Sequence, residues 1–142
     1  TMNWGTRGTG PGEFNVIQGI AIDANDNIYV ADYANERIQV FDTRGNFRRE
    51  MRGFGAPMAI CITPGPNQVM YVSNSNPPDN LDVGGEIYKV ALNGTDIGRF
   101  GTAGKLIGQF GTVNAIDCRE ENGLLGGERG NWRVQRVTLE TI

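Results

Sequence analysis

Three positions in the 142-residue chain carry a polar side chain at the end of an apolar segment and share one register, namely Asp32, Asn74 and Glu128. Carboxylate and amide oxygens are the ligands that Ca²⁺ prefers in proteins. If the fold brings these segment ends together, the three side chains could bind a divalent cation. The structural alternative is that each acid caps a turn and pairs across a hairpin with Arg37 or Arg133. We favour this alternative and keep weak Ca²⁺ binding as the second interpretation.

A second set of residues lies at the start of three other apolar segments, each of which comes before one of those three in the chain. Gln18, Met58 and Asn114 each precede one segment, and Asp117 lies inside the third, where the others carry alanine or cysteine. The candidate ligand-binding residues are Gln18, Met58, Asn114, Asp117, Asp32, Asn74 and Glu128. We name no catalytic residue and no metal ligand among them.

A carboxylate such as that of Asp117 is unusual within such a segment. In a twofold dimer it would occur twice, and a pair of carboxylates can titrate together or bind a cation. The structural alternative is an ion pair with Arg119 or Arg129 at a solvated strand end.

The residue types that are missing exclude several kinds of chemistry. The chain has no histidine, so it lacks the usual general base near neutral pH and cannot form a zinc site of the histidine type. Cys61 and Cys118 fall in opposite register in their segments, and we expect them to be small buried residues rather than a disulfide framework. The net charge of −3 argues against nucleic-acid binding. No apolar run is long enough to cross a membrane.

The elements that must position these residues are short strands separated by turn-forming residues. Ile20, Ile60 and Ile116 mark one face of the first strand in each of three units by period-two alternation, and we expect all three to be buried at equivalent positions. In the first unit, the expected first, second and third strands are 19–23, 28–32 and 37–41. The corresponding strands are 59–63, 70–74 and 86–90 in the second unit, and 115–119, 124–128 and 133–137 in the third. A fourth strand follows twice, around 47–54 and 97–100. The sequence therefore predicts an all-β fold built of four-stranded antiparallel meanders, with an incomplete third unit.

One further segment occurs twice. Residues 4–14 return as residues 100–110, and the two copies share an aromatic residue, a Gly-Thr pair, two further glycines and a closing phenylalanine in the same register. Such internal repetition is typical of propeller blades and solenoids. The first copy has no unit before it, so we expect it to complete the last unit of an array.

The first unit resembles an NHL repeat in residues 10–14, 19–23, 28–32 and 37–41, and the tail 130–137 is similar to the third strand of that repeat. NHL domains are β-propellers, commonly six-bladed. The resemblance implies that residues 1–142 are a single half-propeller with blades near 15–55, 56–103 and 104–142. Residues 1–5 would then be a swapped outer strand that completes the third blade of a partner, so that a homodimer closes a six-bladed ring.

The resemblance also bears on function. First strands line the channel of a propeller, so Gln18, Met58 and Asn114 should surround one mouth. The leading hypothesis is a non-catalytic propeller that binds a ligand, small molecule, peptide or protein at a channel mouth, without a cofactor. One alternative is a divalent-cation-dependent lyase or lactonase-like hydrolase that uses carboxylate ligands, and another is a structural assembly module. The sequence does not distinguish a soluble cytoplasmic protein from an exported one.

Overall fold

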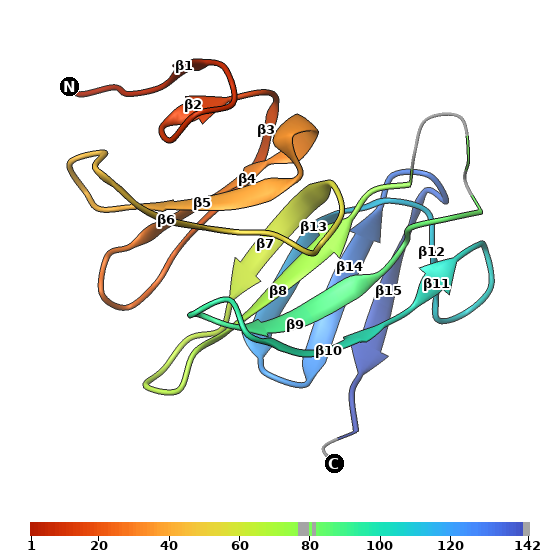
Figure 1. Ribbon diagram of the computed structural model, residues 1–142. Coiled ribbons are helices and arrows are strands. Elements are labelled where there is room, and N and C mark those ends of the chain that lie inside the picture. Colours follow the sequence, from red (N-terminus) through yellow and green to blue (C-terminus); the bar gives the residue numbers. More distant parts are fainter. Residues whose placement is uncertain (77–79, 81, 141–142) are drawn as a thin grey trace.

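The computed structural model describes residues 1–76, 80 and 82–140 of the chain. Three antiparallel sheets follow one another along the chain and lie side by side (Figure 1). We call them blade 1, blade 2 and blade 3. Blade 1 consists of β3 (Ile17–Ile22), β4 (Ile28–Asp32), β5 (Arg37–Phe41) and β6 (Phe47–Met51). Blade 2 consists of β7 (Pro57–Ile62), β8 (Val69–Asn74), β9 (Ile87–Ala91) and β10 (Asp96–Phe100), and blade 3 of β13 (Val113–Glu120), β14 (Gly123–Glu128) and β15 (Arg133–Thr138).

The predicted all-β class and the four-stranded meanders are confirmed. The strand order in blade 1 is β3-β4-β5-β6, and blade 2 has the same meander order. Blade 3 ends at β15, so among the described residues the outer edge of β15 carries no paired strand. The only helical element in the described part of the chain is the short 3₁₀ turn η1 (Tyr33–Asn35). None of the described helices is long and apolar enough to span a membrane.

The repeated segment folds in the same way in both copies. Each copy forms a two-stranded parallel ladder, β1 (Thr6–Arg7) with β2 (Glu13–Phe14) and β11 (Thr102–Ala103) with β12 (Gln109–Phe110). The glycine that follows the first aromatic residue is required by close packing. A Cβ at Gly5 would lie 2.7 Å from the Phe14 ring, and one at Gly101 would lie 2.5 Å from the Phe110 ring. Both glycines also have positive φ, 106° and 85°, which other residues rarely adopt.

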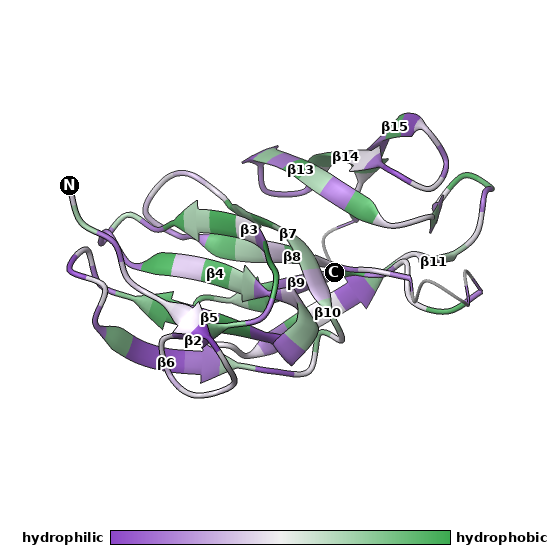
Figure 2. Cartoon of the chain, turned by 90° about the horizontal axis from the view of Figure 1, so that it is seen from above, coloured by the Kyte–Doolittle hydropathy of each residue, from purple (hydrophilic) through white to green (hydrophobic). Residues whose placement is uncertain are grey.

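Most of the core lies between the blades. Alternate residues of each strand point to opposite faces of its sheet. Figure 2 colours the strands by the hydropathy of their residues, which changes along each strand. We call the face that carries the central isoleucine of the first strand the front face, and the opposite face the back face. One apolar cluster joins the back of blade 1 to the front of blade 2, and a second joins the back of blade 2 to the front of blade 3.

This stacking explains why one burial prediction was wrong. Ile60 is 9% exposed and Ile116 packs against the second cluster, because each front face is covered by the preceding blade. Ile20 has the same place on blade 1 but is 63% exposed, because the described residues contain no blade in front of it. Trp4 and Phe14 cover only the middle of that face, where they pack against Phe41.

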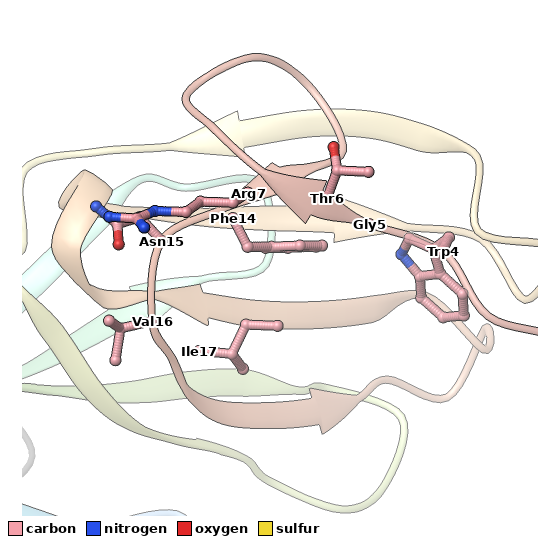
Figure 3. Close-up of a pocket in the computed structure, with 8 residues that line it drawn as sticks. All are labelled: Trp4, Gly5, Thr6, Arg7, Phe14, Asn15, Val16 and Ile17. Atoms are coloured by element: carbon pink, nitrogen blue, oxygen red, sulfur yellow. The ribbon is translucent and has the colours of Figure 1, made fainter.

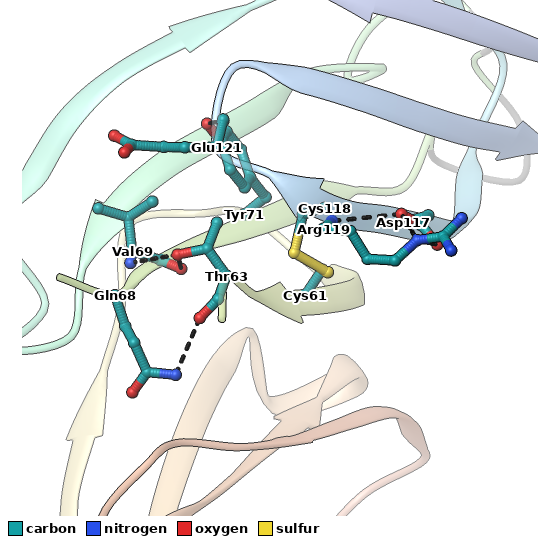
Figure 4. Close-up of a disulfide and its surroundings, with 9 residues drawn as sticks. All are labelled: Cys61, Thr63, Gln68, Val69, Tyr71, Asp117, Cys118, Arg119 and Glu121. Atoms are coloured by element: carbon teal, nitrogen blue, oxygen red, sulfur yellow. Dashed lines mark hydrogen bonds and ion pairs between the residues drawn. A yellow bond between two sulfur atoms is a disulfide. The ribbon is translucent and has the colours of Figure 1, made fainter. Parts of the chain in front are cut away.

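The prediction for the two cysteines was also wrong, because Cys61 and Cys118 form a disulfide (Figure 4). Their opposite register on the strands was correctly identified, but it allows a disulfide between the two cysteines rather than excluding one. Cys61 lies on the back of blade 2 and Cys118 on the front of blade 3, where these faces meet. Two side chains that meet between stacked sheets must come from opposite faces.

Candidate functional site

Asp32, at the end of β4, is the centre of a buried polar cluster in blade 1. Its side chain is inaccessible to solvent. Oδ2 accepts hydrogen bonds from Arg37 Nε at 2.7 Å, Asn35 Nδ2 at 2.9 Å and Gln39 Nε2 at 3.2 Å. Oδ1 accepts one from the Asn15 backbone N–H at 2.8 Å. The carboxylate therefore already has four donors.

The donors of this cluster also hold the repeated segment in place. Arg37 Nη2 donates to the backbone carbonyls of Gly10 at 2.9 Å and Glu13 at 2.8 Å, and Gln39 Nε2 donates to the Glu13 carbonyl at 2.7 Å. Both carbonyls belong to the repeated segment, that of Gly10 in the loop between β1 and β2 and that of Glu13 in β2. The Asp32 cluster is thus a clamp that fixes residues 8–14 to the edge of blade 1.

Blade 3 carries the same clamp with Glu128 in place of the aspartate. Arg133 Nε lies 2.5 Å from Glu128 Oε2, and Asn131 Nδ2 lies 2.8 Å from Oε1. Gln135 Nε2 donates to Oε2 at 2.9 Å. Arg133 and Gln135 also donate to the Gln109 carbonyl, at 2.7 and 2.8 Å. The predicted pairings of Asp32 with Arg37 and of Glu128 with Arg133 are both present.

The protonation of Glu128 reflects this environment. Burial by itself would raise the pKa of the Glu128 carboxyl, but hydrogen bonds from Arg133, Asn131, Gln135 and the Gly111 backbone N–H outweigh burial and lower it. The carboxylate is therefore charged in the folded state, and its charge is needed to hold the clamp together.

Blade 2 lacks the clamp. Glu86 stands where the other blades have arginine, and Asn74 exchanges hydrogen bonds with it, from Asn74 Nδ2 to Glu86 Oε2 at 3.1 Å and from the Glu86 N–H to Asn74 Oδ1 at 2.8 Å. The segment before β7 is also shorter than those before β3 and β13. Asp32, Asn74 and Glu128 thus each serve their own blade, and the structure does not bring them to one point. In the described ranges no three acidic or cysteine side chains lie close enough together to hold a metal ion.

The remaining sequence-predicted residues lie on or near the first strands. Gln18 and Asn114 are exposed, whereas Met58 is 6% exposed and packs in the core. Asp117 lies on the back face of blade 3 and accepts hydrogen bonds from the Arg119 N–H at 3.2 Å and Arg119 Nε at 3.1 Å. These hydrogen bonds, the backbone one first, lower the pKa of Asp117. Ligand binding by these residues stays a prediction.

The sequence did not indicate a groove on the front of blade 1. Its volume is about 590 Å³, and it runs along the start of the repeated segment (Figure 3). The groove is lined by Trp4, Gly5, Thr6, Arg7, Phe14, Asn15, Val16 and Ile17. Val16 has positive φ, 62°, and is half exposed, as is Ile17. A run of uncovered apolar side chains therefore continues from this groove to Ile20 and Ile22.

The corresponding place on blade 3 is filled by blade 2. Thr112 follows Phe110 as Val16 follows Phe14, and it shares the positive φ, 46°. The Asn76 N–H donates to Thr112 Oγ1 at 3.1 Å, and Ser73 Oγ donates to the Val113 carbonyl at 2.5 Å. The groove on blade 1 is thus the kind of surface that a preceding blade occupies within the chain.

Comparison with known proteins agrees with this repeat structure. Residues 14–41, which include β3, β4 and β5, match the NHL repeat. Human NHL repeat-containing protein 3 is 47% identical over 38 residues, which cover 27% of this chain and 11% of that protein. The protein brain tumor of Drosophila melanogaster is 36% identical over 72 residues, which cover 51% of this chain and 7% of that protein.

Solved structures extend the similarity of fold beyond the NHL repeat. Hydrazine synthase of Kuenenia stuttgartiensis superposes with a TM-score of 0.65 at 14% identity, over 86% of this chain and 34% of that one. A protein of unknown function from Bacteroides caccae superposes with a TM-score of 0.60 at 15% identity, over 77% of this chain and 37% of that one. At this identity the similarity concerns the fold, which is that of β-propeller blades. The chain spans only part of each of these relatives.

Proposed function

We propose that this chain is a non-catalytic NHL-type half-propeller that binds protein, and that its first partner is a second copy of itself. Proteins with NHL repeats commonly bind other proteins. The observation that carries the proposal is the exposure of Ile20, which is 63% exposed at the position where blades 2 and 3 are covered by the blade before them. The front of blade 1 therefore has the chemistry of a blade interface and no described blade against it.

The uncovered face is extensive and apolar. Val16, Ile17, Ile20 and Ile22 are 52%, 53%, 63% and 58% exposed. Full burial of one aliphatic side chain of this size contributes roughly 1.5–3 kcal/mol. Covering the four side chains with another blade would therefore be strongly favourable, whereas leaving them in water favours association.

The back of blade 3 is the matching surface in a second copy. It carries the exposed Val134, which is 71% exposed, and the unpaired edge of β15. Within the chain, the back of blade 1 covers the front of blade 2, and the back of blade 2 covers the front of blade 3. Two copies related by a twofold axis would use this contact twice and close six blades into a ring. An obligate interface of this kind buries on the order of 2,000 Å² or more.

The N-terminal residues support the same assembly. Trp4 and Phe100 are equivalent, since each precedes the glycine that packs on the closing phenylalanine. Phe100 is the last residue of β10, the outer strand of blade 2. We therefore propose that residues 1–5 add to the free edge of β15 in the second copy, as β10 adds to β9. In that ring Gln18 and Asn114 would lie at one channel mouth, where we propose that a peptide or protein segment binds.

We propose that the propeller works without a cofactor. The oxygens of Asp32 and Glu128 are committed to arginine and amide donors, which supports a structural role for these acids over Ca²⁺ binding. The disulfide supports export, because such bonds persist mainly in oxidising compartments.

The mass in solution, measured by light scattering over a dilution series, tests the assembly. We expect a dimer, and we expect Ile20→Asp and deletion of residues 1–5 each to shift it towards monomer. Ile107→Asp is the matched control, because Ile107 is 96% exposed in the loop before β12 and its substitution should leave the mass unchanged. A wild-type chain that stays monomeric at all concentrations, or a dimer indifferent to Ile20→Asp, would refute the assembly.

A further inference from the structure

Each internal blade interface is crossed by a basic side chain that reaches a turn of the next blade. In blade 2 this residue is Lys89 on β9. Its Nζ lies 2.8 Å from Glu121 Oε1 and 3.1 Å from Asn122 Oδ1, both in the turn between β13 and β14 of blade 3. In blade 1 it is Arg49, whose Nη2 donates to the Leu92 carbonyl in the turn after β9. The next blade therefore presents an acceptor to the basic residue of the preceding one.

Arg136 is the counterpart of Lys89 in blade 3. Lys89 pairs with Tyr71 on the neighbouring strand, which pairs in turn with Cys61 on the first strand. Arg136 pairs with Leu125, which pairs with Asp117 on the first strand. Both basic residues thus stand in the third strand, on the back face and in the same row. No blade follows blade 3 in the described residues, so no turn is present to accept from Arg136.

Arg136 lies in an open pocket with other charged side chains. The pocket, of about 350 Å³, is on the back of blade 3, and the other charged side chains there are Asp117, Arg119 and Glu120. Asp117 is already neutralised by Arg119, since Arg119 Nε lies 3.0 Å from Asp117 Oδ2. None of the ion pairs found within the described ranges includes Arg136. With Glu120 as its second acid the pocket as a whole is charge-balanced, and what marks Arg136 for an acidic partner is its place in the row of Lys89, which reaches Glu121 of the next blade.

The turn between β3 and β4 of blade 1 supplies the complementary charge. It is the same hairpin turn that holds Glu121 and Asn122 in blade 3, and in blade 1 its tip carries Asp26, which is exposed. Asp23 fixes this tip, because its Oδ1 accepts hydrogen bonds from the N–H groups of Asn25 at 2.8 Å and Asn27 at 3.0 Å. Asp26 is thus held at a defined point, and no ion pair among the described residues includes it.

We infer that Arg136 of one copy pairs with Asp26 of a second copy, and that this pair sets the register in which the back of blade 3 meets the front of blade 1. The inference rests on the proposed dimer and names the residues of its interface. The twofold axis would repeat the pair, so two such ion pairs would hold the ring. Charge pairs at the rim of an interface give specificity and speed association, and they weaken as salt is added.

Charge exchange on the full chain tests this inference by sedimentation equilibrium. We expect Arg136→Glu to raise the dimer Kd about tenfold or more, since two exposed pairs are replaced by two repulsive contacts. Asp26→Asn should weaken the dimer to a smaller extent, and asparagine tolerates the positive φ of 63° at that position. The double variant Arg136→Glu, Asp26→Lys should restore affinity towards that of the wild type. Lys105→Glu changes the net charge equally in an exposed loop and should have no effect.

The outcomes separate this inference from the proposed function. If Arg136→Glu weakens the dimer no more than Lys105→Glu does, the proposed ion pair is wrong but the proposed dimer is not. A loss with Arg136→Glu that Asp26→Lys does not reverse would assign another anion to Arg136. A wild type that is monomeric throughout would overturn both. Far-UV circular dichroism of each variant checks that its overall β-sheet content matches that of the wild type.

Discussion

Cys61 and Cys118 join the back of blade 2 to the front of blade 3 through a disulfide, with their Cα atoms 6.0 Å apart and a sequence separation of 57. Cys118 is 1% exposed and lies among the side chains of the second apolar cluster. The bond is the only covalent link between neighbouring blades in the described part of the chain, apart from the backbone. It therefore limits how far blade 3, whose outer edge is unpaired among the described residues, can separate from blade 2.

Removing this bond should destabilise the fold. A cross-link that closes a long loop restricts the unfolded chain, and removal typically costs about 2–4 kcal/mol. We expect the double variant Cys61→Ser, Cys118→Ser to lose roughly this free energy of unfolding in urea titrations. Reductant should weaken the wild type to a similar degree and leave the double variant unchanged. Equal stability of wild type and double variant would show that packing alone holds blade 3.

The disulfide shows where the sequence was sufficient and where it was not. Period-two alternation correctly placed Cys61 and Cys118 on opposite faces of their strands. The alternation pattern of single strands does not state which faces of successive sheets come together, so the contact between the two cysteines was missed. The prediction that Ile20 is buried was wrong for the same reason. Its register was correct, but its burial depends on another blade. Strand order is a local property, whereas burial between blades depends on the whole assembly.

The contrast between Ile60 and Ile20 provides a second prediction. Ile60→Ala should leave a cavity between blades 1 and 2 and cost about 2–5 kcal/mol. Ile20→Ala should have little effect on the unfolding of a monomer, since the side chain is already in water there. Chemical denaturation at low protein concentration measures both. A loss below about half a kcal/mol for Ile60→Ala would contradict the interface between the two blades, given the range expected for such cavities.

If the dimer forms as proposed, Ile20→Ala should behave differently at high concentration. The side chain would then be buried in the contact with the second copy, and its removal should lower the unfolding midpoint only in the concentration range where dimers exist. The control is Ile60→Ala, whose effect should not depend on concentration in this way.

The Asp32 clamp gives a third prediction. Arg37→Ala removes one partner of a buried ion pair and leaves the Asp32 carboxylate without its strongest donor, which typically costs about 3–5 kcal/mol. The matched control is Arg48→Ala, which breaks an exposed pair with Asp42 at 3.1 Å and should cost less than about 1 kcal/mol. Thermal unfolding measures both. If the two variants lose similar amounts of unfolding free energy, the burial of the Asp32 clamp does not add to its contribution to stability.

The clamp also shows how far the candidate site could be predicted. The shared register of Asp32 and Glu128, and their pairing with arginines, follow from hairpin geometry within one blade and were predicted. That Arg37 and Gln39 also reach the carbonyls of the repeated segment was not predicted, because this segment is irregular and its position depends on tertiary contacts. The groove was missed for the same reason.

The low pKa of Glu128 leads to the last prediction, which concerns acid stability. A carboxyl whose pKa is lower in the folded than in the unfolded state stabilises the fold above its unfolded pKa, about 4.3, and this contribution is lost as the pH falls through the folded value. Glu128→Gln removes the charge at every pH. We therefore expect the variant to be less stable than the wild type at pH 7, and the gap to narrow as the pH falls below about 4. Urea titrations of both proteins between neutral and acid pH measure this gap, and the exposed Glu140 supplies the control variant Glu140→Gln. A gap that stays constant across the range would mean that the ionised carboxylate does not hold the Arg133 clamp.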